Sequence, residues 1–199
     1  MRVIAGTYRS RILKSLRGLA LRPTSDRLRE TLFNVLGQGV VGARFLDLFA
    51  GTGAIGIEAL SRGAAELVFI ENHAPAAALI RRNLESIGIR KGATVLAMDA
   101  LRGIEELASG KKGETWYYDF IFLDPPYDAA NHYARVLESL GSGNLLSPSG
   151  LVIAEHRRNF DLPEGMGALQ CYRVLKQGDA ALSFYRRAAA AAGKDNSAQ

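Results

Sequence analysis

The stretch that decides the fold is FLDLFAGTGAIG, residues 45–56, a short apolar run followed by closely spaced glycines. The apolar run predicts a buried strand, and the glycines at 51, 53 and 56 predict a sharp turn into a helix that leaves the main chain open to a ligand. This spacing matches the GxGxxG pattern of dinucleotide-binding proteins, which alone is weak evidence. The stretch predicts the first strand and helix of an α/β sheet, with a nucleotide-like cofactor beside them.

Strand-like and helix-like segments alternate around and after this stretch. Short apolar runs lie at residues 67–70, 94–97, 120–123 and 151–154, and helix-forming segments lie at 55–62, 74–87, 101–108 and 133–140. Continuous apolar runs are typical of parallel strands buried on both faces, so the alternation predicts an open, doubly wound α/β sheet. Two extended runs at 169–175 and 180–185, separated by Gly178-Asp179, predict an antiparallel hairpin at the end.

The N-terminal part differs from the rest in its charge. Residues 1–30 carry eight Arg or Lys residues and two acidic residues, whereas the whole chain has a net charge of +5. We interpret residues 1–22 as a basic hairpin or arm and residues 26–37 as a leading helix with Ser25 or Asp26 as its N-cap. Residues 44–187 would form the sheet core of a single domain spanning 1–187, and 188–199 a C-terminal tail. A basic arm suggests a polyanionic partner, although a solvated basic surface has the same composition.

The amino-acid composition limits the cellular location that we expect for the protein and the metal or disulfide chemistry that it can use. Cys171 is the single cysteine, so an internal disulfide or a multi-cysteine metal site cannot form. The chain also lacks a run of about 18 apolar residues and the apolar stretch of a signal peptide. We therefore expect a cytoplasmic protein with no membrane partner and no metal.

Three acidic residues follow three consecutive predicted strands. Asp47, Glu71 and Asp99 would line one crevice, because ligands of open α/β sheets bind at the carboxyl ends of the strands. A carboxylate at Asp47 would attract the cationic end of S-adenosylmethionine and repel an NAD pyrophosphate. Glu71 could accept ribose hydroxyls, and Asp99 an adenine amino group. The alternative for each acid is a helix N-cap or a solvated loop residue.

The fourth predicted strand ends in Asp124-Pro-Pro-Tyr127. Two prolines hold the backbone rigid and lack N–H donors, so their carbonyls can accept hydrogen bonds from a substrate. The Asp124 side chain and the Pro125 carbonyl could hold an exocyclic base amine with its lone pair facing a methyl donor, and Asp124 could take up a proton. Tyr127 could stack on an extruded base. The alternative is a Pro-Pro turn that only ends a strand.

Together these motifs resemble the RsmD-type bacterial 16S rRNA guanine-N2 methyltransferases, from Arg2 to about Arg187. The resemblance rests on RPTSDRLRETLFNVL at residues 22–36, LDLFAGTGAIGIEALSRGA at 46–64 and DPPY at 124–127, of which the first is the most specific. It implies a Rossmann-like, seven-stranded S-adenosylmethionine-dependent methyltransferase fold that modifies one guanine of 16S rRNA, naked or in an assembling small subunit, and we expect a monomer. Thr52 replaces the family's common serine and keeps the hydroxyl, whereas Gln177 replaces an aromatic residue.

The expected site residues form three groups. The catalytic group is Asp124, Pro125, Pro126 and Tyr127. The cofactor-binding group is Asp47, Phe49, Gly51, Thr52, Gly53, Glu71, Asn72, Asp99 and Ala100. The RNA-binding group is Arg9, Arg11, Lys14, Arg22, Thr24 and Arg27.

Three other functions remain open on the sequence. An adenine-N6 DNA methyltransferase could use the same Asp-Pro-Pro-Tyr loop, but such enzymes usually need an added recognition domain, for which the chain has little room. A nucleic-acid-binding scaffold could have kept the fold without activity, although the acids and the loop are intact. A small-molecule methyltransferase would leave the basic arm unexplained.

Overall fold

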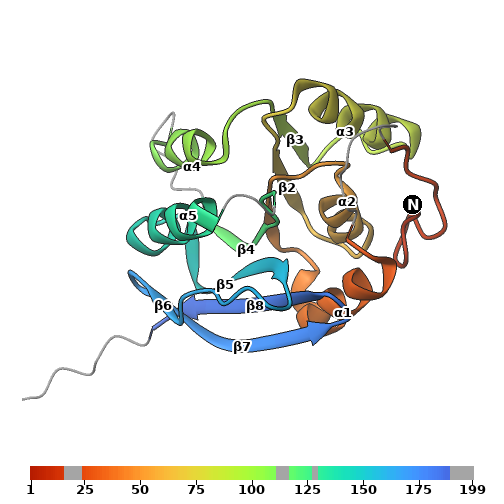
Figure 1. Cartoon of the computed structure of the whole chain (residues 1–199). Helices are drawn as coiled ribbons and strands as arrows, with labels where there is room; N and C mark the ends of the chain where they lie inside the picture. The colour runs from red at the N-terminus through yellow and green to blue at the C-terminus, as the bar shows by residue number, and fades with distance from the viewer. Residues whose placement is uncertain (16–23, 111–116, 127–129, 189–199) are drawn as a thin grey trace, which may run out of the picture.

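A single mixed sheet forms the centre of the protein, whose computed structural model describes residues 1–15, 24–110, 117–126 and 130–188. The strand order is β3-β2-β1-β4-β5-β8-β7-β6 (Figure 1). Five strands pair in parallel: β1 (Arg44–Leu48), β2 (Glu66–Ile70), β3 (Ala93–Leu96), β4 (Tyr118–Leu123) and β5 (Leu146–Arg157). The remaining three add antiparallel: β6 (Gly165–Met166), β7 (Leu169–Gln177) and β8 (Ala180–Arg187).

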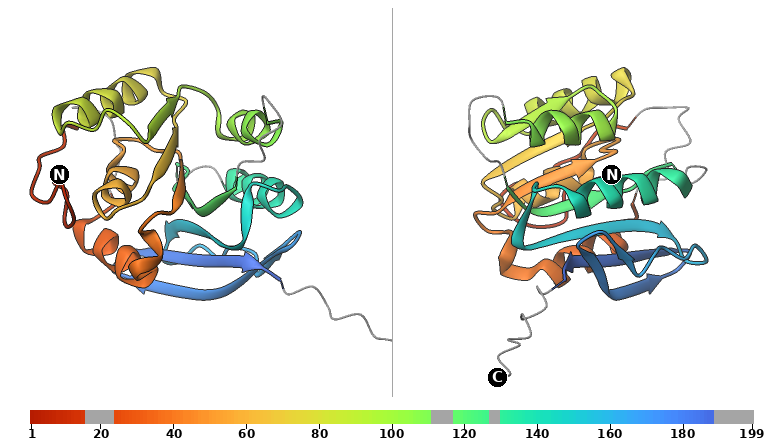
Figure 2. Two further views of the ribbon diagram at one scale, coloured as in Figure 1. Left: turned by 180° about the vertical axis from the view of Figure 1, so that it is seen from behind. Right: turned by 90° about the vertical axis from the view of Figure 1, so that its left-hand side faces the viewer.

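Helices cover both faces of the sheet (Figure 2). One face carries α1 (Asp26–Leu36), the 3-10 helix η1 (Gly37–Val40), α2 (Ala54–Ser61) and α3 (Ala74–Ser86). The other face carries α4 (Ala100–Ala108) and α5 (Ala130–Ser142). Within the described ranges, no helix is long and apolar enough to cross a membrane.

Each parallel strand contributes side chains to two separate apolar cores. In β4, Phe120 and Phe122 pack in the core under α1, α2 and α3, whereas Ile121 and Leu123 pack in the core under α4 and α5. Successive side chains of a strand point to opposite faces, so a strand covered by helices on both sides must be apolar throughout. The continuous apolar runs of the sequence have this cause.

The structure confirms the predicted alternation and the C-terminal hairpin, and it differs from the prediction at two strands. The two-residue β6 adds an eighth strand at the edge, beside β7. Strand β5 begins at Leu146 rather than at residue 151, and its pairing with β4 contains a register shift between Tyr118 and Phe120. The intervening Ser147-Pro-Ser-Gly150 has the composition of a turn, and a bulge is one of the few places where a strand tolerates proline.

Residues 1–15 form a hairpin-like segment with one bridge between Arg2 and Ile12, packed against α2 and α3. Buried polar side chains of α2 and α3 accept hydrogen bonds from the backbone of this segment. Glu58 of α2 accepts hydrogen bonds from the backbone N–H groups of Ile4 (2.7 Å) and Ala5 (3.0 Å). Asn83 of α3 accepts one from the N–H of Lys14 (2.9 Å). Side-chain hydrogen bonds thus dock this segment, which has little strand pairing of its own.

Candidate active site

A pocket lies at the carboxyl ends of β1 and β4, where the chain crosses from strands to helices. It combines residues from the N-terminal segment, the glycine-rich loop and the end of β4. Its described lining consists of Met1, Thr24, Asp47, Phe49, Ala50, Gly51, Thr52, Ala54, Ile55, Phe122 and Asp124. The pocket therefore brings together Asp47, Phe49, Gly51, Thr52, Asp124 and Thr24 from the predicted groups, and it adds Met1, which carries no local sequence signal.

The glycines of the loop after β1 are needed for different reasons. Gly51 and Gly53 have positive φ angles of 54° and 77°, which other residues rarely adopt. Gly56 lies in α2, where a Cβ would overlap the Phe69 ring and Leu67, so the glycine lets the helix approach β2 closely. This loop exposes main-chain groups to the pocket while α2 packs tightly behind it.

Two predicted cofactor residues also hold this loop in shape. Asp47 is buried and accepts a hydrogen bond from the N–H of Gly56 (3.0 Å). Glu71, at the end of β2, accepts one from the N–H of Gly51 (2.7 Å) and one from the N–H of His73 (2.7 Å). Burial, and secondarily the charge of Glu71, raise the pKa of Asp47 to about 8. Asp47 is thus a buried acid whose ionised form a nearby cation would stabilise.

Other predicted residues lie outside the described lining of the pocket. Asp99 is an exposed N-cap of α4, where it accepts a hydrogen bond from the N–H of Leu101 (2.9 Å), and Ala100 is the buried first residue of that helix. Asn72 is exposed beside Glu71. Pro125 is buried and Pro126 exposed, whereas Tyr127 and Arg22 fall outside the described residues. Asp99 therefore has the helix N-cap role that we gave as the alternative to cofactor binding.

Three carboxyl side chains follow one another across neighbouring strands on a single face of the sheet. Asp47 of β1 pairs with Phe122 of β4, and Phe122 pairs with Ile153 of β5, so these three side chains point to one face. Asp124 and Glu155 follow Phe122 and Ile153 by two residues, so they continue on the same face. Burial, followed by the charges of Glu155 and Asp47, raises the pKa of Asp124 well above its usual range. The site therefore holds a concentrated group of acids inside a basic protein.

Sequence reasoning missed Glu155. Its side chain is buried at 3% exposure, and its carboxylate accepts a hydrogen bond from the Thr24 hydroxyl (2.6 Å). The available signal was its place in Leu151-Val-Ile-Ala-Glu155, at the carboxyl end of the fifth predicted strand. The same rule that selected Asp47, Glu71 and Asp124 would have selected it.

The predicted RNA-binding residues lie at different distances from the pocket. Asn83 donates hydrogen bonds to the carbonyls of both Lys14 (3.1 Å) and Thr52 (3.1 Å), so Lys14 lies beside the glycine-rich loop. Arg9 follows a turn held by Ser61, the last residue of α2. That eight-residue helix is about 12 Å long, so Arg9 lies near its far end. Arg11 is exposed in the middle of the segment, near Val3.

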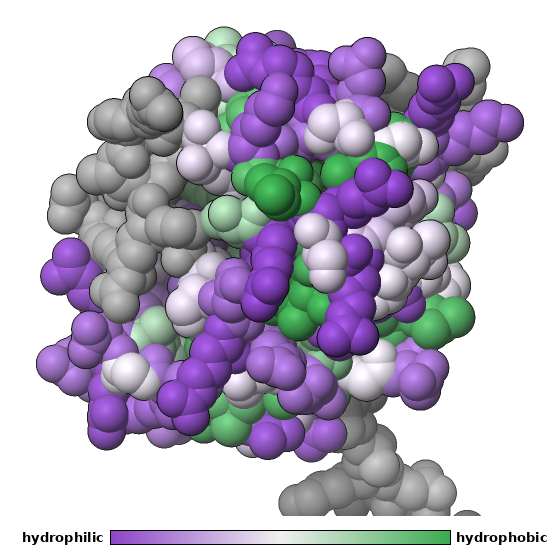
Figure 3. Space-filling view, turned by 90° about the vertical axis from the view of Figure 1, so that its right-hand side faces the viewer, coloured by the Kyte–Doolittle hydropathy of each residue, from purple (hydrophilic) through white to green (hydrophobic). Residues whose placement is uncertain are grey.

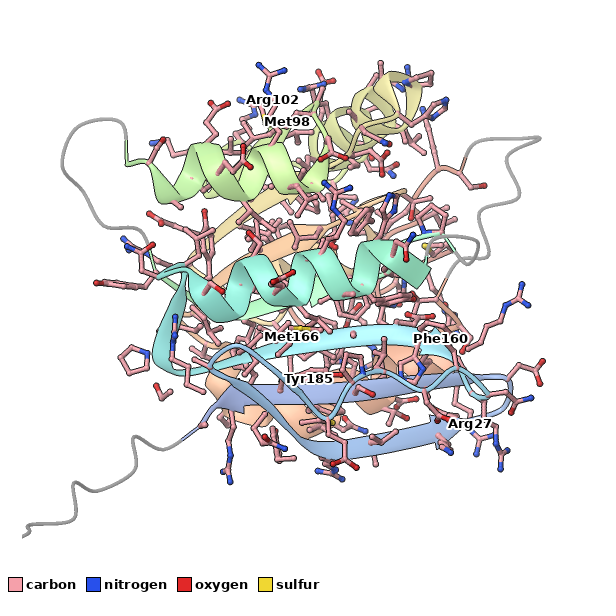
Figure 4. All side chains as sticks on the ribbon, turned by 60° about the vertical axis from the view of Figure 1, so that its left-hand side comes forward. Arg27, Met98, Arg102, Phe160, Met166 and Tyr185 are labelled. Carbon is pink, nitrogen blue, oxygen red and sulfur yellow. The ribbon has the colours of Figure 1, made fainter. Side chains whose placement is uncertain are left out.

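The surface around these residues suits a polar partner. Arg27 is exposed in the first turn of α1, at the end of the molecule where Phe160 follows β5 (Figure 4). The visible surface of the α1–α3 side is mainly hydrophilic, with small hydrophobic spots between charged and polar residues (Figure 3). Asn83 links Lys14 to the pocket residue Thr52, and Arg27 lies in the first turn of α1, three residues after the pocket residue Thr24.

Replacement of Asp47 by Asn is expected to stabilise the protein more at pH 8 than at pH 5. Because the folded state raises the pKa of Asp47 to about 8, it retains a proton that the unfolded chain loses near pH 4, so stability falls as pH rises through this window. Asn can still accept the hydrogen bond from Gly56 and cannot ionise. Urea unfolding at both pH values measures the effect. Exposed Asp161→Asn is the control, and an Asp47→Asn effect independent of pH would contradict the prediction.

Comparisons with known proteins place the chain in a family. A family model described as conserved hypothetical protein 95 matches residues 1–186. Protein YlbH of Bacillus subtilis is 37% identical over 187 residues, which cover 94% of this chain and 99% of that protein. Ribosomal RNA small subunit methyltransferase D of Haemophilus influenzae is 32% identical over 189 residues, covering 94% and 92%. The solved structure of yhhF from Escherichia coli aligns with a TM-score of 0.79 at 33% identity, covering 94% and 97%. The chain therefore belongs to the conserved hypothetical protein 95 family, and its resemblance to the RsmD-type proteins is confirmed over nearly its whole length.

Proposed function

We propose that this protein is an S-adenosylmethionine-dependent methyltransferase that transfers a methyl group to the exocyclic N2 of a guanine in 16S rRNA, in the cytoplasm. The observation that carries the proposal is the pocket shared by the glycine-rich loop, Asp47 and Asp124. A relative that is similar over 94% of the chain is named ribosomal RNA small subunit methyltransferase D. The similarity to this relative supports rRNA as the substrate class, and the residues of the pocket supply the groups that methyl transfer would need.

The residues present fit S-adenosylmethionine. Asp47 is buried and lies in the lining of the pocket, so a cationic ligand end would stabilise its ionised form. The Glu71 carboxylate uses two backbone N–H donors and retains lone-pair positions for ribose hydroxyls. Gly51 and Thr52 line the pocket without a bulky side chain. The bound cofactor would supply an electrophilic methyl group.

The chain's own contribution would be to position the amine and take up its proton. Asp124 and the Pro125 carbonyl would accept hydrogen bonds from the NH2 group, which directs the nitrogen lone pair toward the methyl donor. Asp124 would take up the proton that the nitrogen releases when it is methylated. Burial and the charges of Glu155 and Asp47 raise the pKa of Asp124, so its carboxylate has a higher proton affinity than an exposed one.

For the RNA interface, we propose that Lys14 and Arg27 bind phosphates near the target base, with Arg9 and Arg11 further out. Arg22 stays in the proposed RNA-binding group on the sequence alone. Neutralising Lys14 and Arg27 together should weaken RNA binding and reduce the slope of log affinity against log salt by about 0.7–0.9 for each phosphate that is no longer neutralised. Fluorescence anisotropy across a salt series measures both effects. The matched control is the Arg81→Gln, Arg82→Gln pair, exposed on α3. An unchanged slope in the Lys14 and Arg27 variant would remove these residues from the interface.

The function itself is tested by transfer of labelled methyl from S-adenosylmethionine to RNA. The acceptors are naked 16S rRNA and assembled small subunits from cells lacking the enzyme, followed by nucleoside analysis. N2-methylguanosine is the expected product. Label in N6-methyladenine of DNA would replace this function by the adenine alternative, and absence of transfer to any nucleic acid would support the scaffold or small-molecule alternative.

A further inference from the structure

We propose that Thr24 and Glu155 select guanine by its N1–H group: the Thr24 oxygen accepts the N1–H hydrogen bond, and Glu155 is the positioning residue that turns the hydroxyl for this purpose. The inference rests on the proposed function and deepens it, since it assigns the discrimination between guanine and adenine. Thr24 and Asp124 line the same pocket, which is the pocket proposed to hold the target amine.

The hydrogen bond between Thr24 and Glu155 sets the direction of the hydroxyl. Thr24 Oγ1 donates to Glu155 Oε2 over 2.6 Å. A threonine hydroxyl has one proton and two lone pairs, so a proton committed to Glu155 leaves the oxygen to present lone pairs elsewhere. A hydrogen bond to a carboxylate is stronger than one between neutral groups, which opposes rotation of the hydroxyl. Thr24 therefore faces the pocket as an acceptor.

Both partners are held by regular structure. Glu155 lies near the carboxyl end of β5, where it pairs with Leu182 of β8, and it is buried. Thr24 immediately precedes Ser25, whose side chain caps α1 by accepting a hydrogen bond from the N–H of Leu28 (3.1 Å). Because the two anchors are a sheet strand and a capped helix, the position of the Thr24 oxygen relative to Asp124 is defined by the fold.

The hydrogen-bonding edge of guanine matches this arrangement. Guanine presents the N1–H donor directly beside its N2 amino donor, whereas adenine presents an N1 lone pair beside its N6 amine. Asp124 would accept from the amine and Thr24 from N1–H. With adenine, the N1 lone pair would face the lone pairs of Thr24, and two acceptors enclosed by the bound base would remain without a donor, which is costly.

The test uses short target-site RNAs that carry either guanosine or 2-aminopurine riboside at the methylated position. 2-Aminopurine keeps the 2-amino group, but its N1 is a lone-pair acceptor. The wild-type protein should prefer guanosine by about 10-fold or more in kcat/KM. Thr24→Val, which keeps the shape and loses the hydroxyl, should slow methylation of guanosine and abolish most of that preference, whereas Thr24→Ser should retain it.

Glu155→Gln examines the positioning role. The amide can donate to Thr24, which frees the hydroxyl proton to turn into the pocket, so the preference for guanosine should fall or reverse. Thermal unfolding and S-adenosylhomocysteine binding verify each variant, and if Glu155→Gln does not fold, the Thr24 variants carry the test. An unchanged preference in Thr24→Val overturns this inference alone. A wild-type protein that methylates neither RNA overturns the proposed function and the inference together.

Discussion

Asp124→Asn is expected to reduce methyl transfer by about 10²–10⁴-fold, the usual contribution of a positioned acid–base group. The amide oxygen could still accept a hydrogen bond from the amine. However, the amide could not take up the proton released when the N–C bond forms. The measurement is single-turnover transfer of labelled methyl to 16S rRNA. At saturating RNA and cofactor, the rate constant of the variant reports the chemical step rather than binding.

Two controls separate this role from loss of structure. Titration with S-adenosylhomocysteine should give a dissociation constant for Asp124→Asn within a few-fold of the wild-type value. Asp119→Asn alters the same strand away from the pocket, where Asp119 accepts hydrogen bonds from the N–H of Arg44 (2.9 Å) and from Ser147 (3.2 Å). Turnover of Asp124→Asn close to that of the Asp119 variant would refute the assignment of Asp124.

Glu58→Ala is expected to lower the free energy of unfolding by about 3 kcal/mol, the lower end for removal of one partner of a buried ion pair, because Arg62 keeps 19% of its side chain exposed. Glu58 has no exposed surface, and its carboxylate accepts hydrogen bonds from Ile4, Ala5 and Arg62, the last at 2.7 Å from Arg62 Nε. Without it, two backbone donors and one guanidinium lose their acceptor inside the protein. Urea unfolding monitored by circular dichroism measures the difference.

The effect should also reach the pocket, because Met1 lines it and lies in the segment that Glu58 holds. Methyl transfer by Glu58→Ala should therefore fall even at temperatures where the protein remains folded. Glu85→Ala, at an exposed position of α3, is the control and should change the free energy of unfolding by less than about 0.5 kcal/mol. A decrease below about 1 kcal/mol for Glu58→Ala would show that other interactions dock the N-terminal segment.

The sequence alone determined the fold class and much of the pocket, because these depend on local patterns. Continuous apolar runs such as Phe120-Ile-Phe-Leu123 reveal strands buried on both faces, and the glycines after Asp47 reveal a loop with positive φ angles. Since the carboxyl ends of parallel strands share one edge, the positions of Asp47 and Asp124 in the chain were enough to predict a common site.

Only the tertiary structure decided how distant polar side chains pair. Thr24 and Glu155 are 131 positions apart, and Asn83 joins Lys14 to Thr52 from a third element. Such pairs follow no periodicity, because their geometry results from how helices and strands pack. For the same reason, the sequence does not distinguish Glu58 from an exposed acidic residue of a helix. In the structure, Glu58 is buried and accepts three hydrogen bonds, two of them from the backbone of the N-terminal segment that it holds in place.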